Sequence, residues 1–300
     1  MRATAYMSFA RSGCARTSAG FSMIELAVAL VVIAILLGSI LVPLNTQVES
    51  RNYDETRRIL ERAREALLGF AAANGRFPCP ASATSFGAEA FSQAPFPVGD
   101  ATNGRCDVAL QGTNSVYAGF LPAATLSLTP VDGQGYAVDA WGLSPYNRIR
   151  YAVSYQSLGP GPVQRPFTTA PNPPTNTTGM KAVGMSVISN AVLLQVCSNG
   201  AAPPVVGGSN CGPASNTLTT NAIVVIWSVG PNAATTGGIS ADESENPNPG
   251  PAGVPVGGKI DRVFVSKARS AGTAGEFDDV VTWIGPATVF NRLVQAGQLP

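Results

Sequence analysis

Glu25 places a carboxylate directly before the apolar run Leu26 to Leu44, in which 19 residues carry no charge. At a rise of about 1.5 Å per residue, this run is about long enough to cross the hydrocarbon core of a bilayer. A carboxylate at the edge of hydrocarbon costs about 3 kcal/mol unless it reaches the interface or meets a cation. Glu25 therefore either snorkels to the membrane surface or pairs with a positive charge.

The segment before Glu25 is basic and lacks the apolar core of a secretory signal. Residues 1–20 contain Arg2, Arg11 and Arg16 and no acidic residue. Basic residues before the apolar run and mixed charges after it predict a cytoplasmic N-terminus and an exported C-terminus. No small-residue cleavage site follows the apolar run, so we expect the run to remain in the mature protein.

The residues around Glu25 resemble the cleavage and methylation motif of type IV prepilins and type II secretion pseudopilins. The resemblance combines the basic leader, the apolar run and six residues in order, Gly20-Phe21-Ser22-Met23-Ile24-Glu25. In that family a prepilin peptidase cuts after the glycine on the cytoplasmic side of the membrane and methylates the new amino terminus. The resemblance implies that residues 1–20 are a removable leader, that Gly20 is the cut site and that Phe21 becomes the first residue.

The same resemblance gives Glu25 a partner. After cleavage Phe21 carries a cationic amine, and helices offset along a filament axis can bring this amine to Glu25 of a neighbouring subunit. The two charges then compensate each other in an apolar bundle, and their pairing fixes the axial register. The expected partners are prepilin peptidase, other pilin or pseudopilin subunits and inner-membrane lipid. No nucleic acid is expected, because 19 basic residues nearly balance 18 acidic ones.

A long helix over residues 21–75 must position these groups. We expect residues 21–44 to span the membrane and residues 45–75 to form an amphipathic stalk, with a kink or local loosening at Pro43. The stalk carries an apolar stripe at spacings of three and four, which predicts a face that docks on the chain's own sheet. Its members are Leu60, Ala63, Leu67 and Phe70. Asn74-Gly75, followed by two prolines, predicts the end of the helix.

Residues 76–300 are expected to form an exported domain rich in β-structure. Its short runs of Val, Ile, Tyr and Trp between Gly, Pro and Asn predict strands of an antiparallel sheet. Packed on the stalk, this sheet gives an α+β fold of the pilin type. The predicted strands are Gly135–Val138, Arg148–Tyr155, Ala191–Val196, Ala222–Val229, Arg262–Ser266 and Val280–Ile284, and the predicted long loops are 157–180 and 231–258.

Three segments extend the resemblance into this domain. Residues 139–146, which begin Asp139-Ala140-Trp141-Gly142, resemble the D-x-W-G-x-P-Y segment of major pseudopilins, with one extra residue before the proline. Residues 224–232 resemble a strand and S-x-G-x-N turn found in pilin-like proteins. Residues 275–283 resemble the G-x-x-D-D-I-x-x-W segment that holds calcium in major pseudopilins.

This last resemblance makes Asp278 and Asp279 candidate calcium ligands. Carboxylate oxygens are the hard ligands that Ca²⁺ prefers. The family pattern has a further aspartate upstream, where this sequence has Gly272-Thr273. The alternative is that the two aspartates only cap a turn before a strand.

Four cysteines remain if Cys14 leaves with the leader. They are Cys79, Cys106, Cys197 and Cys211, and they allow three pairings. Pairing nearest neighbours closes the shorter loops, each of which would stabilise the fold by about 3 kcal/mol in the chain-entropy estimate. Disulfides need an oxidising compartment, which the predicted orientation supplies.

The sequence favours a structural role over an enzymatic one. It contains no histidine, which removes histidine-based triads, metal sites and most general-base schemes. We expect a minor pilin or pseudopilin, anchored by one pass in the bacterial inner membrane, with its C-terminal domain in the periplasm before it enters a pilus or pseudopilus. Two alternatives are a surface adhesin or ligand-binding module on a pilin stalk, and a monomeric, signal-anchored periplasmic protein.

Overall fold

A computed structural model gives the structure of the chain. Its side chains are described except at positions 37–45, 110–112, 248–249 and 255–257, where only the backbone is. The described residues are 20, 22–91, 105–107, 110–112, 116–142, 145–156, 158, 165–171, 174–175, 177–199, 210–234, 240–249, 255–257, 261–270 and 276–299.

The chain divides into two units, residues 1–50 and residues 51–300. Helix α1 runs from Met23 to Asn74 and is assigned without interruption through Pro43. Its end agrees with the predicted stop, because Gly75 has a φ of 67° and donates its N–H to the carbonyl of Ala71. Among the described residues, which leave out the side chains at 37–45 of the predicted span, no helix is long and apolar enough to cross a membrane.

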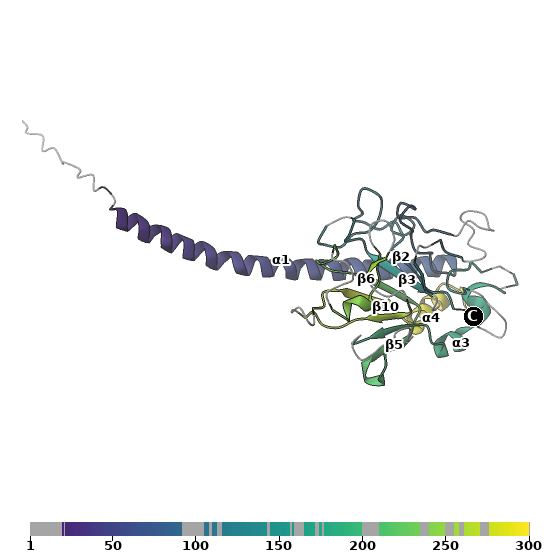
Figure 1. Ribbon diagram of the computed structural model, residues 1–300. Coiled ribbons are helices and arrows are strands. Elements are labelled where there is room, and N and C mark those ends of the chain that lie inside the picture. The colour runs from purple at the N-terminus through teal and green to yellow at the C-terminus, as the bar shows by residue number, and fades with distance from the viewer. Residues whose placement is uncertain are drawn as a thin grey trace, which may run out of the picture. The chain divides into compact units, whose positions relative to one another are not determined.

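The second unit is built around a five-stranded antiparallel sheet (Figure 1). Its strands lie in the order β1-β2-β3-β6-β10, and each pairs with its neighbours in antiparallel register. Their bounds are β1 Leu110–Gly112, β2 Val116–Phe120, β3 Arg150–Ser154, β6 Val224–Ser228 and β10 Val280–Ile284.

This sheet is covered on both faces. Alternate residues such as Tyr117, Tyr151 and Ile226 share one buried cluster with the α1 stripe, in which Leu60, Ala63 and Leu67 are at most 2% exposed. The residues between them, such as Ala152 and Trp227, pack in a second cluster with the neighbouring small sheet. Burial on both faces explains why β2, β3 and β6 have no exposed residue.

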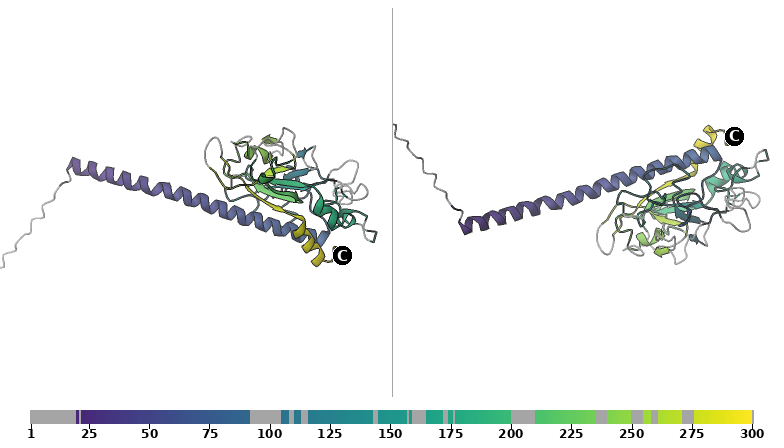
Figure 2. Two further views of the ribbon diagram at one scale, coloured as in Figure 1. Left: turned by 90° about the horizontal axis from the view of Figure 1, so that it is seen from below. Right: turned by 90° about the horizontal axis from the view of Figure 1, so that it is seen from above.

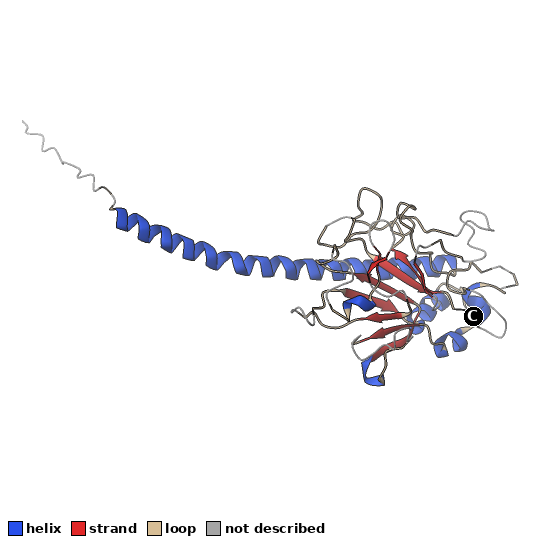
Figure 3. Ribbon diagram, in the orientation of Figure 1, coloured by secondary structure: helices blue, strands red, loops and turns tan. Residues whose placement is uncertain are grey.

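The small sheet has the order β5-β4-β9. Its strands are among those drawn in red in Figure 3. Strand β4 pairs antiparallel with β5 but parallel with β9. The predicted antiparallel arrangement is therefore confirmed for the main sheet, and one parallel pair departs from it. The bounds are β4 Leu194–Cys197, β5 Thr217–Ala222 and β9 Val263–Val265, and the pair β7 Asn248–Pro249 and β8 Pro255–Gly257 forms a separate ribbon.

Short helices complete the second unit, and the sequence analysis missed them. Helix α4 buries Val289, Phe290 and Leu293, and it lies beside the end of α1 in both views of Figure 2. Arg292 of α4 donates a 2.6 Å bond to Glu65 of α1. The helices are α2 Gly179–Val183, α3 Met185–Asn190, α4 Pro286–Gln295 and the 3-10 turns η1 Ala214–Asn216 and η2 Glu243–Glu245.

Some strand predictions were wrong. Residues 135–138 form only isolated bridges, Val131 with Ala137 and Val138 with Arg148. Five strands were not predicted, namely β1, β2, β5, β7 and β8. Of the two predicted loops, the described part of 157–180 ends in helix α2, and the described part of 231–258 contains η2 and the β7–β8 ribbon.

Two disulfides close short loops of the second unit, and one of them begins at the last residue of β4. Cys79 is bonded to Cys106, and Cys197 is bonded to Cys211, with a Cα–Cα distance of 5.4 Å in each case. Of the three pairings that the sequence allowed, this is the nearest-neighbour one. Cys14 lies outside the described residues.

Candidate functional site

The N-terminal site begins at the first turn of α1. Gly20 is exposed and precedes the helix, while Phe21 lies outside the described residues. Ser22 caps the helix, because its Oγ accepts the N–H of Glu25 at 3.2 Å and its own N–H donates to the Glu25 carboxylate at 3.5 Å. This reciprocal pair is a capping box, and it gives Glu25 a local role within one chain. The sequence analysis missed it, although Ser22 and Glu25 have the required spacing.

The helix that follows is apolar and uncovered. Every described side chain from Met23 to Leu36 is exposed, including Ile24 at 75% and Ile35 at 66%. Isolated exposed apolar residues are common on proteins, but a continuous apolar surface marks a site of contact with a membrane or another protein. The described part of the first unit therefore presents a continuous apolar surface.

A second site forms where the three family-like segments of the second unit meet. Asp139, from the first segment, is 3% exposed, and its Oδ2 accepts the hydroxyl of Ser228 at 2.6 Å and the amide of Asn147 at 2.9 Å. The same Asn147 amide also donates to the carbonyl of Gly230 at 2.9 Å. The first segment is thus bonded to the S-x-G-x-N turn that follows β6.

The S-x-G-x-N turn also lies against the third segment, residues 275–283. Gly230 has a φ of 67°, and a Cβ built there would lie 2.7 Å from the carbonyl oxygen of Asp278. Glycine is required both by this conformation and by this contact. The three segments that resembled family patterns separately therefore form one continuous polar site.

Asp278 and Asp279 lie at the centre of an acidic cluster. The N–H of Asp278 donates to Oε1 of Glu243 at 3.1 Å, and Oδ2 of Asp279 accepts the amide of Asn246 at 2.6 Å. Both carboxylate oxygens of Asp278 are buried, and neither makes a hydrogen bond of normal geometry with the described residues, although the Asn232 backbone and the Glu243 side chain lie close enough to affect its pKa. Burial, followed by the like charges of Asp279 and Glu243, raises the pKa of Asp278 to about 8. Burial also raises the pKa of Asp279 to about 7, despite the bond from Asn246.

One buried cation opposes these acids. Arg150 is fully buried in β3 and donates to the carbonyl oxygens of Arg148 and Tyr146. Burial lowers its pKa to about 10, and the nearby Asp139 and then Asp279 act in the opposite direction. The arginine therefore lies between the two buried aspartates that come from different segments.

The acidic cluster meets one requirement of a cation site. Buried carboxylate oxygens without hydrogen bonds of normal geometry, as in Asp278, are what a bound Ca²⁺ would satisfy. In the part of the chain that the structure describes, however, no three His, Cys, Asp or Glu side chains are grouped to hold a metal ion. Residues 271–275, directly before the two aspartates in the sequence, lie outside that part.

Several residues of this site were missed from the sequence. Glu243 lies in residues 231–258, which were predicted only as a long loop, and Asn147, Arg150 and Asn246 were not singled out. Glu243 and Asn246 come from a segment distant from both aspartates, so no spacing in the sequence connects them with Asp139 or Asp278. Only Asn147 lay close to a recognised pattern, one residue beyond the D-x-W-G segment.

The fold is pilin-like, and the N-terminal segment carries a recognisable motif. The stalk half of an N-terminal helix packs on antiparallel β-structure in a pilin-like α+β arrangement, and a capped, exposed apolar segment precedes it. Residues 15–41 match the family described as the prokaryotic N-terminal methylation motif, so the chain carries a motif of the prepilin type. This match includes Gly20, Phe21 and Glu25. Neither the curated proteins nor the solved structures that were compared gave a match.

Proposed function

We propose that this protein is a structural subunit, a minor pilin or pseudopilin, that is processed by prepilin peptidase and assembled through α1 into a type IV pilus or a type II secretion pseudopilus. The observation that carries the proposal is the methylation motif at residues 15–41, within which every described side chain of α1 from Met23 to Leu36 is exposed. Lipid and neighbouring helices are the two environments that can cover such a surface.

Processing is the first test. The protein is purified from the membranes of cells with and without a functional prepilin peptidase, and its N-terminus is determined by mass spectrometry. We expect an N-methylated Phe21 in the first case and residues 1–20 intact in the second. An unprocessed N-terminus on protein from cells that contain the peptidase would contradict the proposal and would leave the monomeric, signal-anchored alternative.

Glu25 can be tested separately from its capping role. Gln at this position keeps the capping box but removes the charge, whereas Ala removes both. If Glu25 pairs with the amine of a neighbouring subunit, Glu25→Gln and Glu25→Ala both lose incorporation into filaments while the chain stays in the membrane. If its role is only capping, Glu25→Gln assembles like the wild type and only Glu25→Ala fails. Ser22→Ala, which breaks the cap and keeps the charge, is the matched control.

The adhesin alternative makes a different prediction. It requires variants in the exported domain that lose attachment to a surface while processing and filament assembly remain normal. A subunit whose domain serves only assembly shows no such separation. Comparing attachment and filament incorporation for the same set of domain variants therefore distinguishes the two functions.

We further propose that calcium binds at Asp278 and Asp279. The proposal rests on the resemblance of residues 275–283 and on the two buried oxygens of Asp278, neither of which makes a hydrogen bond of normal geometry with the described residues. Excess Ca²⁺ should raise the melting temperature of the full-length protein at pH 8, and Mg²⁺ at the same concentration should not. Asp278→Asn should abolish this shift, while Asp54→Asn, on the exposed side of α1, should leave it unchanged. Equal shifts with the two metals would argue against a calcium site.

A further inference from the structure

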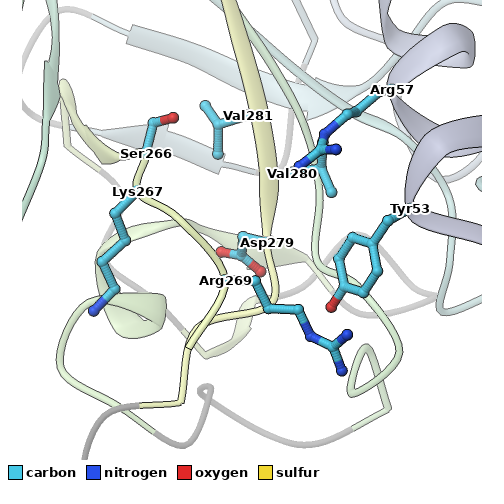
Figure 4. Close-up of a pocket in the computed structure, with 8 residues that line it drawn as sticks. All are labelled: Tyr53, Arg57, Ser266, Lys267, Arg269, Asp279, Val280 and Val281. Carbon is cyan, nitrogen blue, oxygen red and sulfur yellow. The ribbon is translucent and has the colours of Figure 1, made fainter. Parts of the chain in front are cut away.

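A small cavity with a cationic lining opens in the second unit, where α1 meets the chain around β10 (Figure 4). Its volume is about 160 Å³. Eight residues line it: Tyr53, Arg57, Ser266, Lys267, Arg269, Asp279, Val280 and Val281. Neither the prepilin motif nor the acidic cluster accounts for the three cations, which come from two separate parts of the chain.

The cations are held at the cavity in different ways. Arg269 lies with its guanidinium carbon 4.7 Å from the centre of the Tyr53 ring, and Tyr53 in turn packs edge-on against Trp141 at 4.8 Å. Stacking of this kind orients a guanidinium before any ligand arrives. Lys267 lies over the ring of Phe277 and is bonded to Asp242.

Arg57 is the cation that can most readily change partner. It lies one helical turn after Tyr53, so both side chains are on the same face of α1. Its contact with Asp54 is 3.5 Å long and joins two side chains that are about two-thirds exposed. An exposed ion pair of this kind contributes less than about 1 kcal/mol, so a better-placed carboxylate can replace it.

The rest of the lining limits the kind of anion. Val280 and Val281 supply apolar surface, and the carboxyl group of Asp279 lies between the cations in Figure 4. That carboxyl group disfavours an anion with two charges on one centre, such as phosphate. A dicarboxylic acid keeps its two charges apart, so only one of its carboxylates needs to enter the cavity. The planar fork of arginine matches the two oxygens of a carboxylate, and the valines suit a short aliphatic stem.

We propose that this cavity binds a carboxylate carried on a short aliphatic stem. Two sources have this chemistry, an acidic side chain of another subunit and a free dicarboxylic acid. Binding of another subunit's side chain rests on the proposed function in a filament, whereas binding of a free dicarboxylic acid does not.

Binding is tested first with glutarate, titrated by calorimetry into the full-length protein in a non-ionic detergent. We expect saturation with a Kd of about 1 mM or less. Arg57→Gln and Arg269→Gln should each weaken binding about 10-fold or more, because each removes charge-assisted hydrogen bonds. Arg58→Gln is the matched control, since Arg58 is the next residue of α1, is similarly exposed and does not line the cavity.

The source is tested in cells with a photo-crosslinking residue at Val281. An acidic side chain of another subunit predicts a crosslink to that subunit that Arg57→Gln reduces and Arg58→Gln does not. A free carboxylate predicts glutarate binding without such a crosslink. The proposal is overturned if glutarate fails to bind and the crosslink is absent or insensitive to Arg57→Gln, or if sulfate displaces glutarate at equal concentration. Processing at Gly20 and the effect of Glu25→Gln are measured on the same strains. A failure of the proposed filament function is then distinguished from a failure of carboxylate binding at the cavity.

Discussion

The hydroxyl of Ser228 donates a 2.6 Å hydrogen bond to Oδ2 of Asp139, although the two residues are 89 positions apart. The same hydroxyl accepts the N–H of Gly230 at 3.2 Å. One side chain therefore joins the end of β6 to the segment before β3 and also closes the turn that faces Asp278. Together with the Asn147 amide, which donates to both Asp139 and Gly230, this bond holds the first two segments of the polar site together.

Replacing Ser228 with Ala should destabilise the domain by about 2 kcal/mol. The change leaves the buried Asp139 carboxylate with one donor fewer and the Gly230 N–H without its acceptor. Urea denaturation of the full-length protein measures the loss. Thr220→Ala, at an exposed position of β5, is the control and should change stability by less than about 0.5 kcal/mol. Equal effects of the two changes would show that the bond to Asp139 contributes little.

Gly230 and Gly142 offer a matched pair for separating backbone strain from contact. Their φ angles are 67° and 66°, but a Cβ at position 230 meets Asp278 at 2.7 Å, whereas nothing lies within 4 Å of one at position 142. Gly142→Ala should cost about 1 kcal/mol from strain alone. Gly230→Ala should cost at least about 2 kcal/mol more, because Asp278 must move. Similar melting temperatures for the two variants would contradict the close approach of the turn to Asp278.

The sequence predicted those parts of the fold that depend on local patterns. The stripe of Leu60, Ala63 and Leu67 indicated the buried face of α1, and the β-branched run of residues 224–228 indicated β6. Strand β2 was missed because both of its faces are buried and it contains Ala118 and Gly119, so it shows no alternation. Helix α4 was missed although its buried residues follow a helical spacing and Pro286 stands at its first position.

The same distinction between local and long-range patterns applies to the residues of the two candidate sites. Gly20, Phe21 and Glu25 lie within six residues, so their pattern was readable in the sequence. The partners of Asp139 and Asp278 include Ser228 at the end of β6 and Glu243 of η2, and tertiary folding alone brings these residues together. Glu243 illustrates this limit, because an acidic residue in a Gly- and Pro-rich segment usually lies in solvent, and here it is 4% exposed.

The ion pair between Arg76 and Glu89 should be important where the chain leaves α1. Glu89 accepts two bonds from the guanidinium, at 2.8 and 2.9 Å, and the Arg76 side chain is only 9% exposed. The rings of Phe70 and Phe91 flank the guanidinium. Glu89→Gln should therefore cost about 3 kcal/mol, because it leaves a buried cation without its counter-ion.

An exposed ion pair within α1, between Glu61 and Arg64, provides the comparison for Glu89→Gln. Glu61 and Arg64 are 2.6 Å apart, but the Glu61 side chain is 57% exposed. Glu61→Gln should cost less than about 0.5 kcal/mol in the same urea titration. A cost for Glu89→Gln as small as this would mean that water reaches Arg76.

The buried carboxyl groups predict an unusual dependence of stability on pH. Burial raises the pKa of Asp139, and it raises those of Asp278 and Asp279 to about 8 and about 7, from 3.8 for an unperturbed aspartate. Between pH 4 and pH 8 the folded protein therefore holds protons that the unfolded chain has released. The free energy of unfolding should then fall as the pH rises through this window, with no further fall from these groups above about pH 8.

Urea midpoints measured at pH 5 and pH 8, with a chelator present to remove calcium, test this sign. The midpoint should be lower at pH 8. Asp279→Asn, which resembles the protonated acid and can still accept the bond from Asn246, should reduce the difference and stabilise the protein at pH 8. Asp54→Asn should leave the difference unchanged, because its side chain is 65% exposed. A midpoint that rises between pH 5 and pH 8 would show that Asp278 and Asp279 are ionised in the folded protein, held in that state by charges other than a metal ion.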